Sequence, residues 1–378
     1  MFPSTGAKSR QMNYDEETQN PRTITMPDQP LRLGVIGMGP NNMASTLVLL
    51  RDAPDLRYRI TAICGLPANV IERCAREFET PFWTTDYREL VARQDVDVVC
   101  VFSPDALHAE HCIAALEHGK HVVCTKPMVT RREDAQRLVE LVCRKRVKFL
   151  VGQTMRFDRQ FLHAQQLFDS GQLGAPIALE SHYVHDMRPV FGLTPWRLTM
   201  PQDFMFGGCV HGIDVLRAFG GDVRRVHAIA RKGNLTPRYP LVDNFFLNLE
   251  FTSGVIGRVS GLYGVVHPPL PMMQLGIYGS KGSLQAEFTD NAPGEIRVVL
   301  DQAAGKPPTV IPFEAEHDRS AYGHGATVIR YMRHFQECID GNRATSPGVL
   351  DGAKAVAVGA AAWESIRTGK VVEVNNEF

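Results

Sequence analysis

The sequence predicts an α/β protein of two domains. The first has a parallel sheet, and the second is an α+β domain with a large, mainly antiparallel open sheet. Two observations lead to this prediction: short apolar runs alternate with amphipathic stretches from Leu31 to about Gly152, and strand-like runs then follow one another from about 223 to 313. Strands that alternate with helices form βαβ units, whereas successive strands without helices pair antiparallel.

The first domain is expected to contain five strands and five helices. The apolar runs predict strands at 31–37, 59–64, 97–102, 120–124 and 148–151, and the amphipathic stretches predict helices at 40–51, 67–78, 86–93, 105–118 and 130–146. Residues 1–30 are rich in Pro, Gln, Asn, Ser and Thr and predict a flexible N-terminal tail. We therefore divide the chain into a tail (1–30), a first domain (31–152) and a C-terminal domain (153–378).

The C-terminal domain begins with a predicted helix at 158–169 and a strand at 177–186. A loop around 195–197 and a helix starting near Gly208 precede the run of strands. In 245–251 the odd positions are apolar and the even positions mostly polar, which is typical of a sheet with one solvated face. Helices are predicted again at about 324–340 and 349–368, the latter rich in Ala and Gly.

Composition excludes several classes of partner. The 378 residues include 41 Lys+Arg and 41 Asp+Glu, so the balanced charge does not favour nucleic acid or an anionic membrane. The eight cysteines are scattered without a C-x-x-C pair, which argues against a disulfide framework or a metal site. With no signal peptide and no membrane-spanning run, the chain is expected to be cytoplasmic.

A glycine turn follows the first strand and predicts a Rossmann dinucleotide-binding domain. The turn is Gly37-Met38-Gly39-Pro40-Asn41-Asn42, which keeps the first two glycines of G-x-G-x-x-G and has Asn42 at the third. The first glycine permits the tight turn, and the second lets a pyrophosphate approach the backbone at the helix N-terminus. An unrelated Gly-Pro turn is the alternative interpretation.

The end of the second strand bears on the choice of nucleotide. An NAD-type fold usually has Asp or Glu there to bind the ribose 2′-hydroxyl, but this chain has Gly65. Nothing at that position would repel a 2′-phosphate. We therefore expect NADP or NAD, with a weak preference for NADP.

Lys126 follows an apolar run that Pro127 ends, so it lies at the carboxyl end of a parallel strand. Ligands of open α/β sheets bind at such ends, which places an amine beside the nucleotide. Ser103 and Pro104 end the preceding strand and would flank the cofactor, with His108 one turn into the next helix. A surface charge for Lys126 and a packing role for His108 are the alternatives.

These segments resemble the Gfo/Idh/MocA oxidoreductases, over about residues 31–375. The motifs that carry the resemblance are Gly37/Gly39, Ser103-Pro104-Asp105 with His108, Gly119-Lys120-His121-Val122, Thr125-Lys126-Pro127, Trp196-Arg197, Gly207-Gly208 and His211-Gly212-Ile213-Asp214. Each is unspecific alone, but their shared order is typical of the family.

The resemblance implies reversible hydride transfer between a nicotinamide and a secondary alcohol of a sugar, polyol or cyclitol. It implies Lys126 and His211 as catalytic residues, and Trp196-Arg197 close to the cofactor. Polar residues expected to hold the substrate, besides Lys126 and His211, are Arg156, His185, Asp186 and Asp214. It also implies a homodimer or homotetramer formed through the C-terminal sheet.

Two departures leave other functions open. Thr125 stands where the family usually has Glu, and Gly207 where it often has Asp; Asp203, Asp186 or Asp214 could substitute for the latter. A catalytically silent dinucleotide-binding regulator is one alternative. Cofactor-assisted non-redox chemistry on a sugar, with the same residues, is another.

Overall fold

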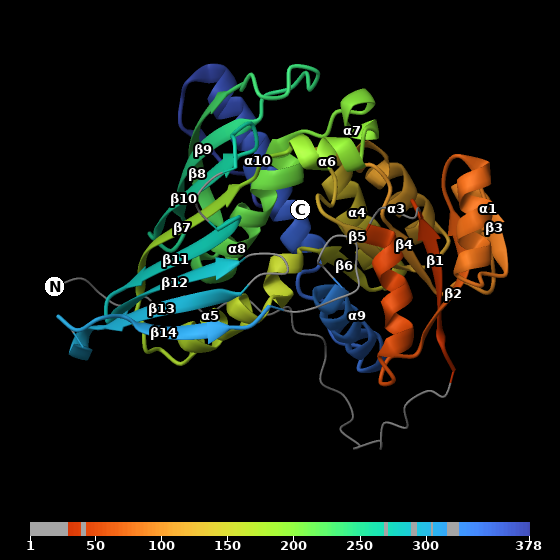
Figure 1. The fold of residues 1–378 in the computed structure, drawn as a ribbon, viewed down its shortest axis with the longest axis horizontal. Helices are drawn as coiled ribbons and strands as arrows, with labels where there is room; N and C mark the ends of the chain where they lie inside the picture. Colours follow the sequence, from red (N-terminus) through yellow and green to blue (C-terminus); the bar gives the residue numbers. More distant parts are fainter. Residues whose placement is uncertain (1–28, 39–42, 268–270, 289–292, 304, 316–324) are drawn as a thin grey trace.

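The computed structural model describes residues 29–38, 43–267, 271–288, 293–303, 305–315 and 325–378. The predicted tail at 1–30 therefore lies almost entirely outside the described residues. Two sheets form the protein, with helices between and around them (Figure 1). The predicted α/β class with two differently built sheets is confirmed.

The first sheet has six parallel strands in the order β3-β2-β1-β4-β5-β6. Its strands are β1 (Leu31–Ile36), β2 (Tyr58–Cys64), β3 (Phe82–Thr84), β4 (Val98–Val101), β5 (His121–Thr125) and β6 (Phe149–Gly152). The connecting helices are η1 (Met43–Asp52), α1 (Ala68–Glu77), α2 (Tyr87–Val91), η2 (Asp105–Leu107), α3 (His108–Glu117) and α4 (Arg132–Lys145). Strand β3 was not predicted; it is only three residues long and has an exposed Trp83 at its centre.

The order of the strands reverses between β1 and β4, which is where doubly wound sheets bind their ligands. Chain connections leave β1 toward β2 on one side and β4 toward β5 on the other. Ligands of such sheets bind at the carboxyl edge of the strands, beside this reversal. Both Gly37 and Lys126 lie at this edge.

The second sheet has nine strands in the order β14-β13-β12-β11-β7-β10-β9-β8-β15. Its strands are β7 (Pro176–Val184), β8 (Val223–Arg231), β9 (Asn244–Phe251), β10 (Ile256–Leu262), β11 (Met273–Gly279), β12 (Gly282–Phe288), β13 (Gly294–Leu300), β14 (Thr309–Phe313) and β15 (Val372–Glu373). The β7–β10 pair is parallel and the other pairs are antiparallel, so the mainly antiparallel sheet is confirmed.

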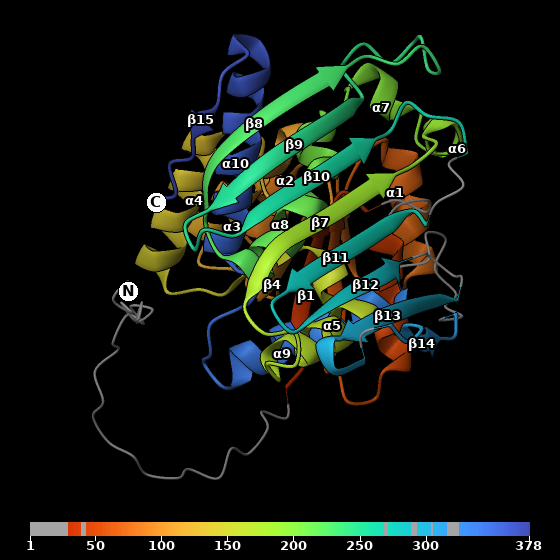
Figure 2. The same ribbon diagram turned by 90° about the vertical axis from the view of Figure 1, so that its left-hand side faces the viewer.

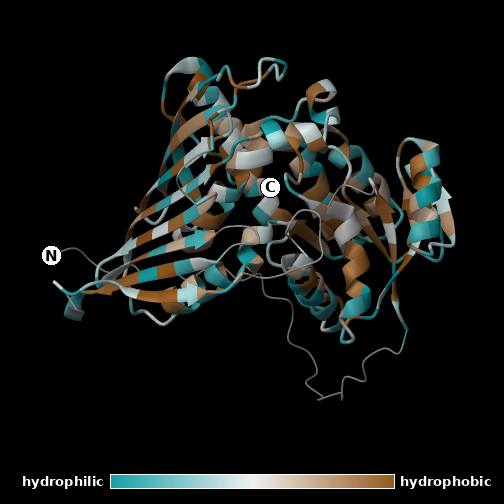
Figure 3. Cartoon of the chain, in the orientation of Figure 1, coloured by the Kyte–Doolittle hydropathy of each residue, from teal (hydrophilic) through white to brown (hydrophobic). Residues whose placement is uncertain are grey.

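Helices cover one face of this sheet, and Figure 2 shows the other face open toward the viewer. The covering helices include α5 (Arg159–Asp169), α8 (Val210–Gly220) and α10 (Val349–Thr368). Along β9 the odd positions from Phe245 to Phe251 are buried and Phe246 is exposed, as the alternation predicts. Figure 3 shows the same alternation of apolar and polar residues along the strands.

The last two long helices join the sheets. Helix α9 (Gly325–Asp340) packs Val328, Tyr331 and Phe335 into the core of the first sheet, beside η1. Helix α10 contacts α4 and β6 as well as α8 and β8. The boundary at residue 152 thus coincides with the end of β6, but the chain later returns to the first domain.

Short helices α6 (Arg188–Leu193) and α7 (Trp196–Thr199) replace the predicted loop around 195–197. The eight cysteines are free thiols, seven of them buried. Within the part of the chain that the structure describes, no helix has both the length and the apolar character to cross a bilayer.

Candidate active site

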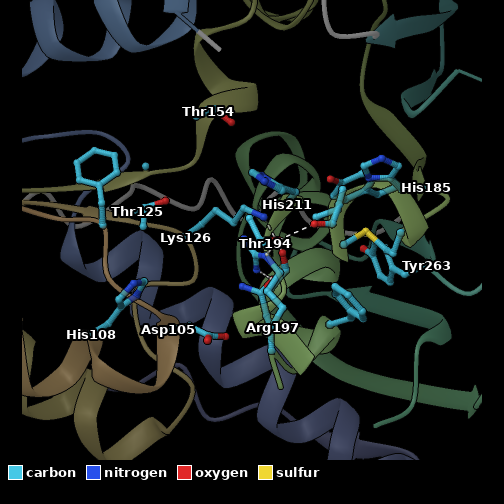
Figure 4. A pocket seen from close by; sticks show the side chains of 18 of the residues that line it. Asp105, His108, Thr125, Lys126, Thr154, His185, Thr194, Arg197, His211 and Tyr263 are labelled. Atoms are coloured by element: carbon cyan, nitrogen blue, oxygen red, sulfur yellow. Dashed lines mark hydrogen bonds between the residues drawn. The ribbon is translucent and has the colours of Figure 1, made fainter. Parts of the chain in front are cut away.

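A cavity of about 420 Å³ lies between the carboxyl edge of the first sheet and the elements around α8 (Figure 4). Its wall combines side chains of both domains. From the first come Phe102, Ser103, Asp105, His108, Thr125, Lys126 and Gly152; from the second come Thr154, Tyr183, His185, Met187, Val190, Thr194, Trp196, Arg197, Gln202, Phe204, Gly207, His211, Tyr263, Met272 and Met273. Seven of the predicted site residues are therefore brought together in one cavity: Ser103, His108, Lys126, His185, Trp196, Arg197 and His211.

Gly37, the first residue of the predicted glycine turn, meets the end of β4 beside this cavity. Gly37 has φ +92°, and a Cβ there would lie 2.4 Å from the backbone nitrogen of Ser103. This position therefore requires glycine, and the β1 turn lies against the loop that flanks the cavity. Such a bare backbone turn at the strand-order reversal suits a dinucleotide pyrophosphate. The other predicted turn residues, Gly39, Pro40, Asn41 and Asn42, lie outside the described residues.

Gly65 has a steric explanation as well. A Cβ at this position would lie 2.6 Å from Ile71 Cδ1 and 2.8 Å from the Met38 carbonyl oxygen. The backbone oxygen cannot move away easily, so the turns after β1 and β2 pack closely here. The missing acidic side chain at position 65 is thus a consequence of packing.

Lys126 directly follows β5 and points into the cavity (Figure 4). Its Nζ donates a hydrogen bond of 2.6 Å to the carbonyl oxygen of Gly207, across the boundary between the domains. Residue 207 thus binds the Lys126 amine through its backbone carbonyl. Thr125 lines the cavity next to it.

His211 is the second residue of α8 and is 5% exposed. Its ring packs edge-on against Tyr183, with 5.9 Å between the ring centroids. The His185 ring stacks with the same Tyr183 ring, with 6.0 Å between the ring centroids. Burial, and then the charge of Lys126, lower the pKa of His185, which favours its neutral form. Lys126, His185 and His211 thus border one space.

His108 belongs to the scaffold of the site. It is 1% exposed, its Nδ1 lies 2.7 Å from the Pro127 carbonyl oxygen, and its Nε2 lies 2.8 Å from the Ser103 carbonyl oxygen. Burial lowers the pKa of His108, although two carbonyl acceptors can both be satisfied only by a doubly protonated ring. In either state the ring ties the loop after β4 to the loop that carries Lys126, and both nitrogens face backbone rather than a ligand.

Arg197 and Trp196 form a second polar corner of the cavity. The Arg197 guanidinium lies 4.5 Å from the centre of the Trp196 ring, donates from Nε to Thr194 Oγ1 at 3.1 Å, and donates from Nη1 to Gln202 Oε1. Thr194 and Gln202 were not predicted from the sequence. They carry no motif, and short helices α6 and α7 bring them to the wall.

Arg156, Asp186, Asp214 and Pro104 do not line the cavity as the structure describes it. Arg156 and the fully buried Asp214 form a bidentate ion pair with N–O distances of 2.6 and 2.7 Å. Asp186 accepts hydrogen bonds from Arg188, which hold the pKa of its carboxyl well below its usual range. These side chains are committed to each other or to neighbours, which the sequence does not reveal.

Asp203, which was predicted as one possible replacement for the Asp that the family often has at position 207, does not line the cavity either. Its carboxylate accepts hydrogen bonds from the Met205 backbone nitrogen at 2.8 Å and from Trp363 Nε1 at 2.7 Å. Burial raises the pKa of Asp203 to about 6. The described residues contain no cluster of three His, Cys, Asp or Glu side chains that could hold a metal ion.

Two protein-family models match this chain. Residues 31–153 match the model described as "Oxidoreductase family, NAD-binding Rossmann fold", and residues 161–285 match the GFO/IDH/MocA C-terminal domain. The chain belongs to the Gfo/Idh/MocA oxidoreductase family. The predicted resemblance is confirmed, and a dinucleotide-binding first domain follows from it.

Several relatives act on sugars or cyclitols. Scyllo-inositol 2-dehydrogenase (NAD(+)) of Bacillus subtilis is 26% identical over 311 residues, 80% of this chain and 85% of the relative. Levoglucosan dehydrogenase of Pseudarthrobacter phenanthrenivorans is 24% identical, covering 92% and 98% of the two chains. A solved levoglucosan dehydrogenase complex with NADH and levoglucosan has a TM-score of 0.81 at 23% identity, over 92% of this chain and 100% of that one. At this identity the solved structure shows the shared fold.

Proposed function

We propose that this protein is an NAD(P)-dependent dehydrogenase or reductase that transfers hydride between the nicotinamide and a secondary alcohol or ketone of a sugar, polyol or cyclitol. One observation carries the proposal: Lys126 of the first domain and His211 of the second line a single cavity that adjoins the Gly37 turn. The names of the relatives support the substrate class.

The bound nicotinamide would accept or supply the hydride. The protein residues must then move the hydroxyl proton, because an alcohol loses both a hydride and a proton on oxidation. His211 is of the residue type that takes up a proton near neutral pH and serves as the base. Lys126, anchored on the Gly207 carbonyl, stabilises the negative charge that develops on the oxygen. His185 and Thr194 offer further hydrogen-bonding groups to substrate hydroxyls.

We propose NAD(H) as the cofactor. Solved structures of similar fold are titled as complexes with NADH, and the inositol relative is named for NAD(+). The preference for NADP expected from Gly65 has no support from these comparisons. Because Gly65 has no side chain that repels a 2′-phosphate, NADP is expected to be tolerated.

The open face of the nine-stranded sheet supports a homo-oligomer formed through this face, as the resemblance implies. Large apolar side chains are exposed there on neighbouring strands, including Ile229 at 58%, Phe246 at 44% and Ile256 at 58%. Exposed apolar patches of this kind mark association sites. Sedimentation of wild type beside Phe246→Lys measures this: a smaller assembly in the variant is expected.

The function is tested with a panel of inositols, aldoses and anhydro sugars, each with NAD and with NADP, followed at 340 nm. At least one secondary alcohol should be oxidised. A folded protein that binds NADH but turns over no compound in either direction would contradict the proposal. NADH binding without turnover would favour the second candidate, a catalytically silent regulator. This candidate is kept because Thr125 and Gly207 stand where acidic residues were expected. Product analysis separates the third candidate, because non-redox chemistry on a sugar returns the cofactor unchanged.

A further inference from the structure

Two side chains cover the paired glycines that precede the His211 helix. Gly207 and Gly208 belong to η4 (Met205–Cys209), a π-helical turn that leads directly into α8. A Cβ at Gly208 would lie 2.2 Å from Tyr263 Cζ, and a Cβ at Gly207 would lie 2.5 Å from both Cγ and Cδ of Gln202. The space beside position 207 is therefore filled by the side chain of Gln202.

Hydrogen bonds hold both the side chain and the backbone of Gln202. It is 8% exposed, and its Oε1 accepts a hydrogen bond from Arg197 Nη1. Its backbone oxygen accepts a hydrogen bond of 2.5 Å from the hydroxyl of the buried Tyr239. A buried glutamine held in this way cannot swing aside without leaving polar groups unsatisfied.

The same side chain lies between the two cationic residues of the cavity. Arg197 binds its amide directly. The side chain also fills the space beside the Gly207 Cα, and the carbonyl oxygen of Gly207 accepts the hydrogen bond from Lys126 at 2.6 Å. Figure 4 shows Lys126 and Arg197 entering the cavity from its two sides. The other titratable groups on the cavity wall are Asp105, His108, Tyr183, His185, His211 and Tyr263, with Asp203 behind it.

A neutral amide at this place has a specific electrostatic consequence. It gives Arg197 an acceptor and supports the Gly207 backbone without adding a negative charge near Lys126. A carboxylate of the same size would accept the same hydrogen bond but would favour the charged form of a nearby amine. The difference between amide and carboxylate is therefore visible as a change in pH dependence.

We propose that Gln202 is a positioning residue of the active site, which holds Arg197 and the Gly207 backbone whose carbonyl accepts the hydrogen bond from Lys126, without adding a negative charge there. The proposal rests on the proposed dehydrogenase function, because it concerns the residue assigned to stabilise the reacting oxygen. It also explains why position 207 carries no side chain: the amide of Gln202 takes that space.

The test compares Gln202→Glu and Gln202→Met with Gln172→Glu, an exposed control of the same chemistry. In Gln202→Glu, the pH at which kcat reaches half its maximum should move upward by roughly one to two units, the range expected for a new opposite charge near the amine. In Gln202→Met, kcat/KM should fall about tenfold or more with the pH profile unmoved.

The outcomes separate this proposal from the function on which it rests. Wild-type turnover with an unmoved profile in a folded Gln202→Glu protein would overturn the positioning role alone. No wild-type turnover on the panel would overturn the dehydrogenase function and this proposal with it. If Gln202→Glu does not fold, Gln202→Met decides: unchanged kcat/KM would overturn the proposal.

Discussion

Acid should destabilise this protein through His111, a residue that supports the loop after β4. The imidazole is 7% exposed, and its Nδ1 lies 2.8 Å from Ser103 Oγ. Burial lowers the pKa of His111 to about 4. The neutral ring can accept a hydrogen bond from the Ser103 hydroxyl, whereas the protonated ring cannot.

The direction follows from the difference between the folded and unfolded states. Above pH 6.5 both states carry neutral His111, so the residue adds no pH dependence. As the pH falls below 6.5 the unfolded chain binds the proton first, and the free energy of unfolding decreases until the folded state also titrates near pH 4. For a pKa of about 4 against 6.5, the loss between pH 7.5 and pH 5 is about 2 kcal/mol.

Urea unfolding of wild type, His111→Leu and His118→Leu at both pH values measures this loss. His118 is exposed at the end of the same helix and serves as the control. Other buried histidines contribute to the acid sensitivity of all three proteins, so the comparison between variants isolates His111. The His111→Leu protein should lose about 2 kcal/mol less than wild type and His118→Leu. Equal losses in all three would refute the reasoning.

Two further predictions concern the scaffold of the site. Gly37→Ala should weaken NADH binding at least tenfold in a folded protein, because the added Cβ would lie 2.4 Å from the Ser103 backbone nitrogen; an unchanged Kd by fluorescence titration would contradict this. Arg156→Met should lower the free energy of unfolding by about 3–5 kcal/mol, because it leaves the buried Asp214 carboxylate without its guanidinium partner. If Arg156→Met instead raised KM and left the free energy of unfolding unchanged, Arg156 would be a substrate ligand, as predicted from the sequence.

The features of the site that sequence predicted follow from strand geometry. Lys126 and the Gly37 turn come directly after apolar strands, and the carboxyl ends of parallel strands share one edge of a sheet. That rule brings them together without knowledge of any side-chain contact. The alternation of apolar and polar residues in 245–251 predicted a sheet with one solvated face in the same way, because successive side chains of a strand point to opposite faces.

The features that sequence missed depend on contacts across long separations. Arg156 pairs with Asp214, 58 residues away, so two polar residues that seemed available for substrate neutralise each other. Helix α9 looks like part of the C-terminal domain in the sequence, but its apolar face packs on the first sheet. The side chain of Gln202 fits beside the π-helical turn because Gly207 has no side chain, and no spacing in the sequence signals that.

The central claim is that Lys126 and His211 act together on one hydroxyl in the cavity between the domains. Single-turnover hydride transfer, followed at 340 nm at saturating cofactor, tests it most directly in Lys126→Met, His211→Asn and the double variant. Each single variant should slow transfer by roughly 10²–10⁴-fold with NADH affinity retained, and the double variant should lose far less than the product of the two effects. Full-rate transfer in either folded single variant would contradict the account.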